Sequence, residues 1–115
     1  MPKRINIIAD QDRLFPVQAF FNAIGDSSFI DIIKYLIDRI DVEVDGVHCE
    51  FPENIEIGEE DFVGVQFTLI DEEITVEEQV FRKFLQLACE YHVNAYPIDE
   101  LAILHLLSTL KSNNL

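Results

Sequence analysis

The stretch from Ile40 to Phe81 constrains the fold more than any other part of this chain. Fourteen of the 22 acidic residues lie in it, together with none of the eight Lys and Arg residues. The remaining acids balance the bases, so the net charge of −14 resides in this window. Apolar residues nevertheless alternate with polar ones, as in Val42-Glu43-Val44 and Val47-His48-Cys49. A disordered acidic tail lacks such β-branched residues, so the pattern predicts a folded sheet with an acidic exterior.

The length of 115 residues is typical of one domain, and we predict a single domain over residues 1–115. Near the start, Ile7, Ile8 and Ala9 form an apolar run too short for a signal-peptide core or a membrane span. This predicts a cytoplasmic protein, in which Cys49 and Cys89 are free, buried thiols. The acidic balance and scattered bases argue against nucleic-acid or membrane binding and favour a basic partner.

Apolar residues at spacings of three and four predict two helices before the acidic window. The first begins near Pro16, because proline is tolerated in a first turn, and ends at Gly25. The second follows the N-cap candidates Asp26-Ser27-Ser28. The lead-in from Arg4 to Ala9 fits a short strand or an irregular segment equally well. The apolar stripe of the second helix consists of Phe29, Ile32, Ile33, Leu36, Ile37 and Ile40.

Three strands are predicted inside the window. They run from Val47 to Phe51, from Val63 to Ile70 and from Ile74 to Val76. An acidic loop, Glu53 to Asp61, joins the first two, and the turn Asp71-Glu72-Glu73 joins the last two. The excess acids therefore lie at the ends of strands.

Two further helices are predicted after the strands, from Glu77 to Ala95 and from Asp99 to Lys111. The first should bury Val80, Phe81, Phe84, Leu85 and Ala88, extended by Tyr91 and Tyr96. The second should bury Leu101, Leu104, Leu107 and Leu110. The expected fold is thus α+β, with two N-terminal helices, a three-stranded antiparallel meander and two C-terminal helices.

Candidate chemical sites are weak. Asp41 to Gly46 begins like a calcium-binding helix-loop-helix loop, but the bidentate Glu falls one position late, at Glu53. For zinc, the sequence offers Cys89 with His92 and the adjacent pair His48-Cys49. For a nucleophile and base, it offers only Cys89 with His92 or His105. No paired Cys-x-x-Cys, Gly-rich phosphate loop or Gly-x-Ser-x-Gly motif is present. We therefore predict no catalytic residues, no metal and no cofactor, with a small hydrolase as the minority alternative.

Several segments together resemble a known family over about residues 17–110. The family is that of the small immunity proteins of bacterial contact-dependent growth inhibition systems, specifically those paired with ribonuclease toxin domains. The resemblance implies a cytosolic protein that binds the toxin domain of its own cell line and covers its active site. It implies no catalytic residues. The segments are Phe20-Phe21-Asn22-Ala23, Ile30 to Ile40, Val44 to Pro52, Phe62 to Phe67, Asp71-Glu72-Glu73 and Phe84 to Glu90 with the tyrosine after it.

The expected partner is the basic C-terminal ribonuclease domain of the cognate toxin, because a surface that holds RNA is basic and an acidic inhibitor imitates the phosphates. The alternative function is that of a small acidic adaptor. The expected interface is the acidic loop and hairpin tip, because binding residues concentrate on loops of a rigid scaffold. The outward strand face with His48, Glu50, Gln66 and Thr68 is the alternative interface. The predicted toxin-binding residues are Glu53, Glu56, Glu59, Glu60, Asp61, Asp71, Glu72 and Glu73.

Overall fold

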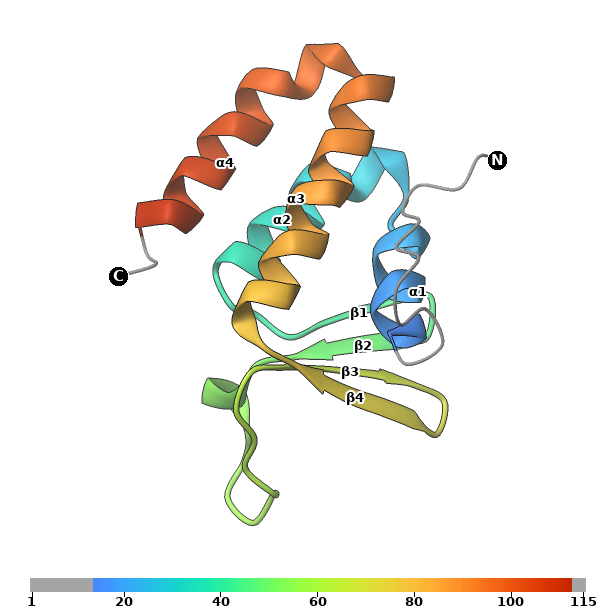
Figure 1. Ribbon diagram of the computed structural model, residues 1–115, viewed down its shortest axis with the longest axis vertical. Helices are drawn as coiled ribbons and strands as arrows, with labels where there is room; N and C mark the ends of the chain where they lie inside the picture. The colour runs from blue at the N-terminus through green and yellow to red at the C-terminus, as the bar shows by residue number, and fades with distance from the viewer. Residues whose placement is uncertain (1–13, 113–115) are drawn as a thin grey trace.

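An antiparallel sheet carries the helices on one face and leaves the other face uncovered (Figure 1). The structure is a computed structural model that describes residues 14–112, so the predicted lead-in of residues 4–9 lies outside the described residues. The helices are α1 (Phe15–Ala23), α2 (Phe29–Ile37), α3 (Glu78–Ala95) and α4 (Glu100–Ser112), with the 3-10 turns η1 (Asp26–Ser28), η2 (Pro52–Asn54) and η3 (Pro97–Asp99). The strands are β1 (Val42–Val44), β2 (Val47–Glu50), β3 (Val65–Leu69) and β4 (Glu72–Val76).

The sheet is a meander with the strand order β1-β2-β3-β4. The α+β class is confirmed, but the prediction of three strands is wrong because β1 pairs with β2. Asp45 and Gly46 have φ values of 51° and 85°, as a two-residue type I′ hairpin turn requires. The sequence Asp-Gly between two alternating runs is a strong hairpin signal, but the predicted meander counted only the run after it as a strand.

The second hairpin is also tighter than predicted. β4 begins at Glu72, so the turn between β3 and β4 consists of Ile70 and Asp71 alone. Glu72 and Glu73 are therefore strand residues, which point to opposite faces of the sheet. Ile70 takes a φ of 57°, an unusual value for a β-branched residue.

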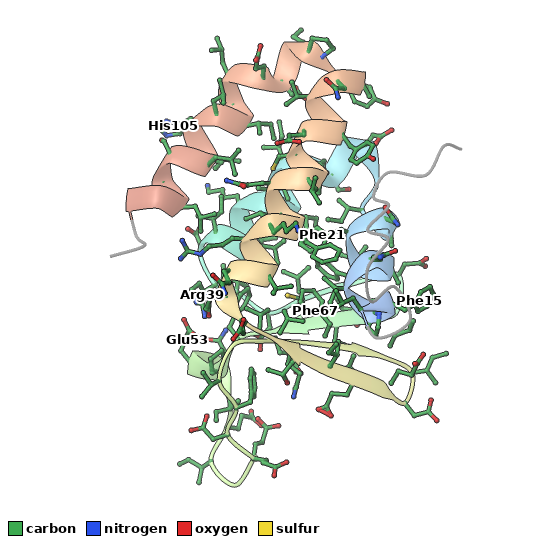
Figure 2. The ribbon with its side chains drawn as sticks, viewed as in Figure 1. Phe15, Phe21, Arg39, Glu53, Phe67 and His105 are labelled. Carbon is green, nitrogen blue, oxygen red and sulfur yellow. The ribbon has the colours of Figure 1, made fainter. Side chains whose placement is uncertain are left out.

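A cluster of aromatic rings fills the space between the sheet and the helices. Phe21 of α1 packs edge-on against Phe20, with ring centroids 5.3 Å apart, and stacks on Phe84 of α3 at 6.2 Å. Phe67 of β3 reaches the same cluster from the sheet, 5.5 Å from Phe20 (Figure 2). Each of these fully buried rings contributes about 1.5–3 kcal/mol of transfer free energy. The side chains on the inner face of the sheet are therefore buried in the core and are not available to a partner.

The two C-terminal helices bury only part of the predicted stripes. In α3, Phe81, Phe84, Leu85 and Ala88 are buried, as predicted. In α4, Ile103 is buried at 1% exposure, and the predicted Leu107 and Leu110 pack partly buried against the core. The predicted Leu101 and Leu104 are 82% and 53% exposed. The predicted stripe missed Ile103 because a leucine repeat at spacing three or four resembles a core face. Tyr91 of α3 and Tyr96 just after it are exposed, and His92 is buried instead.

The N-cap expectation for α2 is also wrong, because Ser28 makes no side-chain capping bond and residues 26–28 form the 3-10 turn η1.

Candidate functional site

The uncovered face of the sheet carries polar side chains in rows that run across the strands. Strand register aligns Glu43, His48, Thr68 and Glu73 in one row. Glu50, Gln66 and Thr75 form the next row. These residues alternate with the buried residues of the inner face. Their side chains therefore lie on the face that the helices leave uncovered.

The segment from Ile55 to Gly64 joins η2 to β3. It differs from the expected loop of Glu53 to Asp61, because Glu53 lies in η2 and β3 begins only at Val65, and it is called the acidic loop from here on. It projects away from the sheet at one end of the molecule (Figure 1). A hollow of about 440 Å³, which we call the acidic hollow, lies where this loop meets the outer sheet face. Its carboxylate lining consists of Asp41, Glu50, Glu59, Glu60, Asp61 and Glu73. Its apolar lining consists of Phe51, Ile55 and Phe62, and no lining residue is basic.

The hollow combines the two interfaces that the sequence presented as alternatives. From the predicted loop and hairpin set it receives Glu59, Glu60, Asp61 and Glu73. From the outward strand face it receives Glu50 and Gln66. Four predicted residues, Glu53, Glu56, Asp71 and Glu72, do not line it. Sequence reasoning missed Asp41, which was interpreted only as the first residue of a rejected calcium loop.

The alternation of β4 explains why the hairpin acids separate. Glu73 pairs with Thr68, an outer-face residue, and lines the hollow. Glu72 pairs with Leu69, which belongs to the helix-covered face. Asp71 lies in the turn. Three consecutive carboxylates therefore do not form one patch.

The base of the acidic loop is anchored through Arg39, which lies just after α2. Its N–H donates to the carbonyl of Leu36, and the N–H of Ile40 donates to that of Tyr35. These bonds form a Schellman motif, with Arg39 at the left-handed position usually occupied by glycine, at a φ of 62°. The conformation directs the Arg39 side chain across the surface toward η2.

The Arg39 guanidinium joins two carboxylates from different parts of the chain. It donates to both oxygens of Glu78 at the start of α3, at 2.9 and 2.8 Å. It also donates to both oxygens of Glu53 in η2, at 2.5 and 3.2 Å. Figure 2 shows the Arg39 and Glu53 side chains near each other. Its Cζ atom lies 4.7 Å from the ring centroid of Phe51. Glu53 is thus paired within the protein.

The pKa values reflect this pairing. The hydrogen bonds that Arg39 donates to Glu78 raise the pKa of Arg39 above its ordinary value, although burial opposes the change. The hydrogen bonds from Arg39 lower the pKa of Glu53 below its ordinary value. Both groups therefore remain charged over the physiological pH range, so the ion pair between Arg39 and Glu53 is present throughout that range.

Asp41 and Asn54 complete the anchor. One oxygen of Asp41 accepts from the N–H of Phe51 at 2.9 Å and from the amide of Asn54 at 3.0 Å. The same amide donates to the carbonyl of Arg39 at 2.8 Å. Residues on either side of the first hairpin thereby hold the start of the acidic loop.

The cysteines and the buried histidine, which the sequence offered as candidates for zinc binding or catalysis, do not line the hollow. Cys49 and Cys89 are free and buried, as predicted. Burial raises the pKa of Cys89 to about 12 and that of Cys49 further above its usual range. His92 stacks on Phe29 with ring centroids 4.2 Å apart, and its Nε2 lies 2.7 Å from a carboxylate oxygen of Asp99. Within residues 14–112 no three His, Cys, Asp or Glu side chains are grouped to hold a metal ion.

A comparison with protein families identifies the group to which this chain is similar. A family model described as a CDI immunity protein matches residues 13–107, most of the chain. The chain belongs to the CDI immunity protein family. CDI denotes contact-dependent growth inhibition, so the resemblance seen in the sequence is confirmed at the level of the family. No curated protein matches the chain.

Membership in the CDI immunity protein family indicates the general role of this protein. A CDI immunity protein neutralises a cognate CDI toxin by binding it, which is an inhibitor's role. None of the helices within the described residues has the length and apolar character needed to cross a membrane.

Proposed function

We propose that this immunity protein neutralises a basic ribonuclease toxin domain by covering its RNA-binding surface with the acidic hollow. The proposal rests on one observation above all. Six carboxylates line a single hollow on the uncovered sheet face, with no basic residue among its lining. They come from the residue before β1, from β2, from the acidic loop and from β4. The cytoplasm, where a delivered toxin would meet RNA, is the proposed site of action.

The lining suits cationic side chains. Lysine and arginine bury apolar stems while their charged ends stay near polar groups. The apolar residues Phe51, Ile55 and Phe62 offer a surface for such stems, and the surrounding carboxylates offer acceptors for the charged ends. Carboxylates placed where RNA phosphates would lie compete for the lysines and arginines that a nuclease uses to bind RNA. Inhibition then follows from occlusion.

The predicted contact residues outside the hollow keep supporting roles in this proposal. Glu53 holds the loop through Arg39, and Glu56 belongs to the turn of the acidic loop. Asp71 and Glu72 extend the acidic field along the edge of the sheet. Exposed charges of this kind accelerate encounter more than they stabilise the complex.

The test uses the purified cognate toxin domain, with binding and RNA cleavage as readouts. Glu59→Gln, Glu60→Gln and Asp61→Asn together remove three charges while keeping hydrogen-bond acceptors. We expect this triple variant to raise Kd at least about tenfold and to inhibit cleavage less well. The matched control, Asp31→Asn, Glu90→Gln and Glu100→Gln, removes three exposed charges from the helices. Equal effects of the two triple variants would contradict a role for the hollow.

A second comparison separates the hollow from the hairpin tip. Changing Asp71, Glu72 and Glu73 together to Lys reverses three charges, of which only that of Glu73 faces the hollow. If the hairpin tip is the centre of the interface, reversal costs about 2–5 kcal/mol or more. We expect the single reversal Glu73→Lys to account for most of the loss. A larger loss from reversing Asp71 and Glu72 alone would move the interface to the tip.

A further inference from the structure

The apex of the acidic loop is an ordered turn that presents one apolar side chain. The N–H of Glu59 donates to the carbonyl of Glu56 at 3.1 Å, closing a four-residue turn. Gly58 occupies the third position with a φ of 96°, which a type II turn requires. The N–H of Glu56 also donates to a carboxylate oxygen of Glu59 at 2.8 Å. Two hydrogen bonds thus fix the second residue of the turn, Ile57.

Ile57 is fully exposed at this position. The turn does not require isoleucine, because the second position of a type II turn accepts most residues and favours proline. The protein core does not use it either, since the side chain lies entirely in solvent. Glu56, Glu59 and Glu60 surround it in the chain. An isoleucine held by an ordered turn among carboxylates has no folding function that the structure reveals.

Single exposed apolar residues are common on protein surfaces, so exposure alone carries little weight. Ile57 differs because of where the loop puts it. The acidic loop projects at one end of the longest axis of the molecule (Figure 1), and its base is anchored by the Arg39 and Asp41 hydrogen bonds. A projecting and anchored apolar group loses little conformational freedom on binding.

We propose that Ile57 is the apolar anchor of the toxin interface, inserted into an apolar depression that is bordered by basic side chains on the toxin domain. This inference rests on the proposed function and assigns the two parts of the loop different tasks. The carboxylates steer and align a basic partner, whereas burial of Ile57 slows dissociation. Interfaces commonly have such a division, with a desolvated apolar centre inside a polar rim. The charge on the partner follows from the carboxylates on both sides of the turn.

The experiment measures binding of Ile57→Ser to the purified cognate toxin domain. Loss of a buried isoleucine should raise Kd about 10- to 100-fold, mainly through faster dissociation, with an unchanged dependence of association on salt. Ile57→Leu should restore Kd to within about threefold, because it retains the apolar volume. The matched control is Ile98→Ser in η3, an equally exposed isoleucine near the opposite end of the molecule. It should bind as the wild type does.

Each outcome decides between the two proposals. If the wild-type protein binds the toxin domain and Ile57→Ser binds equally well, the anchor is refuted and the acidic hollow stands. Equal losses for Ile57→Ser and Ile98→Ser also refute the anchor, because the effect is then not local. If the wild-type protein binds the toxin domain without inhibiting RNA cleavage, the proposed function fails and the anchor is judged on Kd alone. A wild-type protein that does not bind overturns both.

Discussion

Two substitutions of Arg39 measure separately what its side-chain contacts contribute to the free energy of unfolding and what its left-handed backbone conformation costs. Arg39→Ala removes a guanidinium that is bidentate to both Glu53 and Glu78 and lies over Phe51. The Arg39 side chain is 30% exposed and its partners are 50% and 41% exposed, so each pair is screened by solvent. We assign about 1 kcal/mol to each pair and about 0.5 kcal/mol to the ring contact. The expected loss in the free energy of unfolding is therefore about 2–3 kcal/mol.

Arg39→Gly provides the internal comparison. It loses the same side-chain contacts but relieves the left-handed conformation, which costs a residue other than glycine about 1–2 kcal/mol. Part of that relief is offset by the greater freedom of glycine in the unfolded chain. We expect the order of stability to be wild type, then Arg39→Gly, then Arg39→Ala, with about 1 kcal/mol between the two variants. Urea unfolding followed by circular dichroism at pH 7 measures all three.

The pH dependence of the stability difference between wild type and Arg39→Ala provides a further check on the role of Arg39. The folded pKa of Glu53 lies below its unfolded value, so its pairing stabilises the fold at pH values above the ordinary glutamate pKa of about 4.3. The contribution is lost as pH falls through the lowered folded pKa. The stability difference between wild type and Arg39→Ala should consequently shrink in that acidic range. A constant difference between pH 7 and pH 3, or equal stability of the two proteins at pH 7, would refute this account of Arg39.

Three other predictions address the loop, the thiols and the association rate. Gly64→Ala should destabilise the fold by about 2 kcal/mol or more in urea unfolding. The added Cβ would lie 2.2 Å from the Val76 carbonyl oxygen, and Gly64 has a φ of 108°, which strains alanine. Unchanged stability would be inconsistent with this close approach. Cys49 and Cys89 should resist iodoacetamide in the native protein and react after unfolding, because burial keeps both protonated. Replacing both by Ala should leave toxin binding intact, and a folded double variant that fails to protect cells would indicate a chemical role. Stopped-flow association with the toxin domain should slow steeply as salt rises, and a flat profile would remove electrostatic steering.

Elements with strong periodicity were predictable from the sequence because their pattern reports the buried face directly. The stripe of α2 and the alternation of β2 and β3 placed Phe29, Ile33, Cys49 and Phe67 correctly in the core. In α4, every position from Leu101 to Leu107 except His105 is apolar, so the pattern there does not show which side of the helix is buried. The structure selects Ile103 there because α4 packs only one side against α2 and α3.

The acidic site was predicted in composition but not in arrangement. Carboxylates of the loop could be recognised as exposed, yet their position relative to the outer sheet face depends on the pairing of β2, β3 and β4. Arg39 carries no local signal of its role, since its partners are 14 and 39 residues away along the chain. Long-range pairing therefore decides which of many acids are available to a partner.

The acidic loop has a consequence for how such proteins acquire new partners. Its ends are held by Arg39, Asp41 and the close approach of Gly64 to β4, while Ile57, Glu59, Glu60 and Asp61 contribute no buried side chain to the core. Substitutions between these two fixed ends change the surface offered to a toxin at little expense in stability. Recognition can thus diversify independently of the scaffold, so that a lineage can follow a changing toxin through mutations confined to about ten residues of loop.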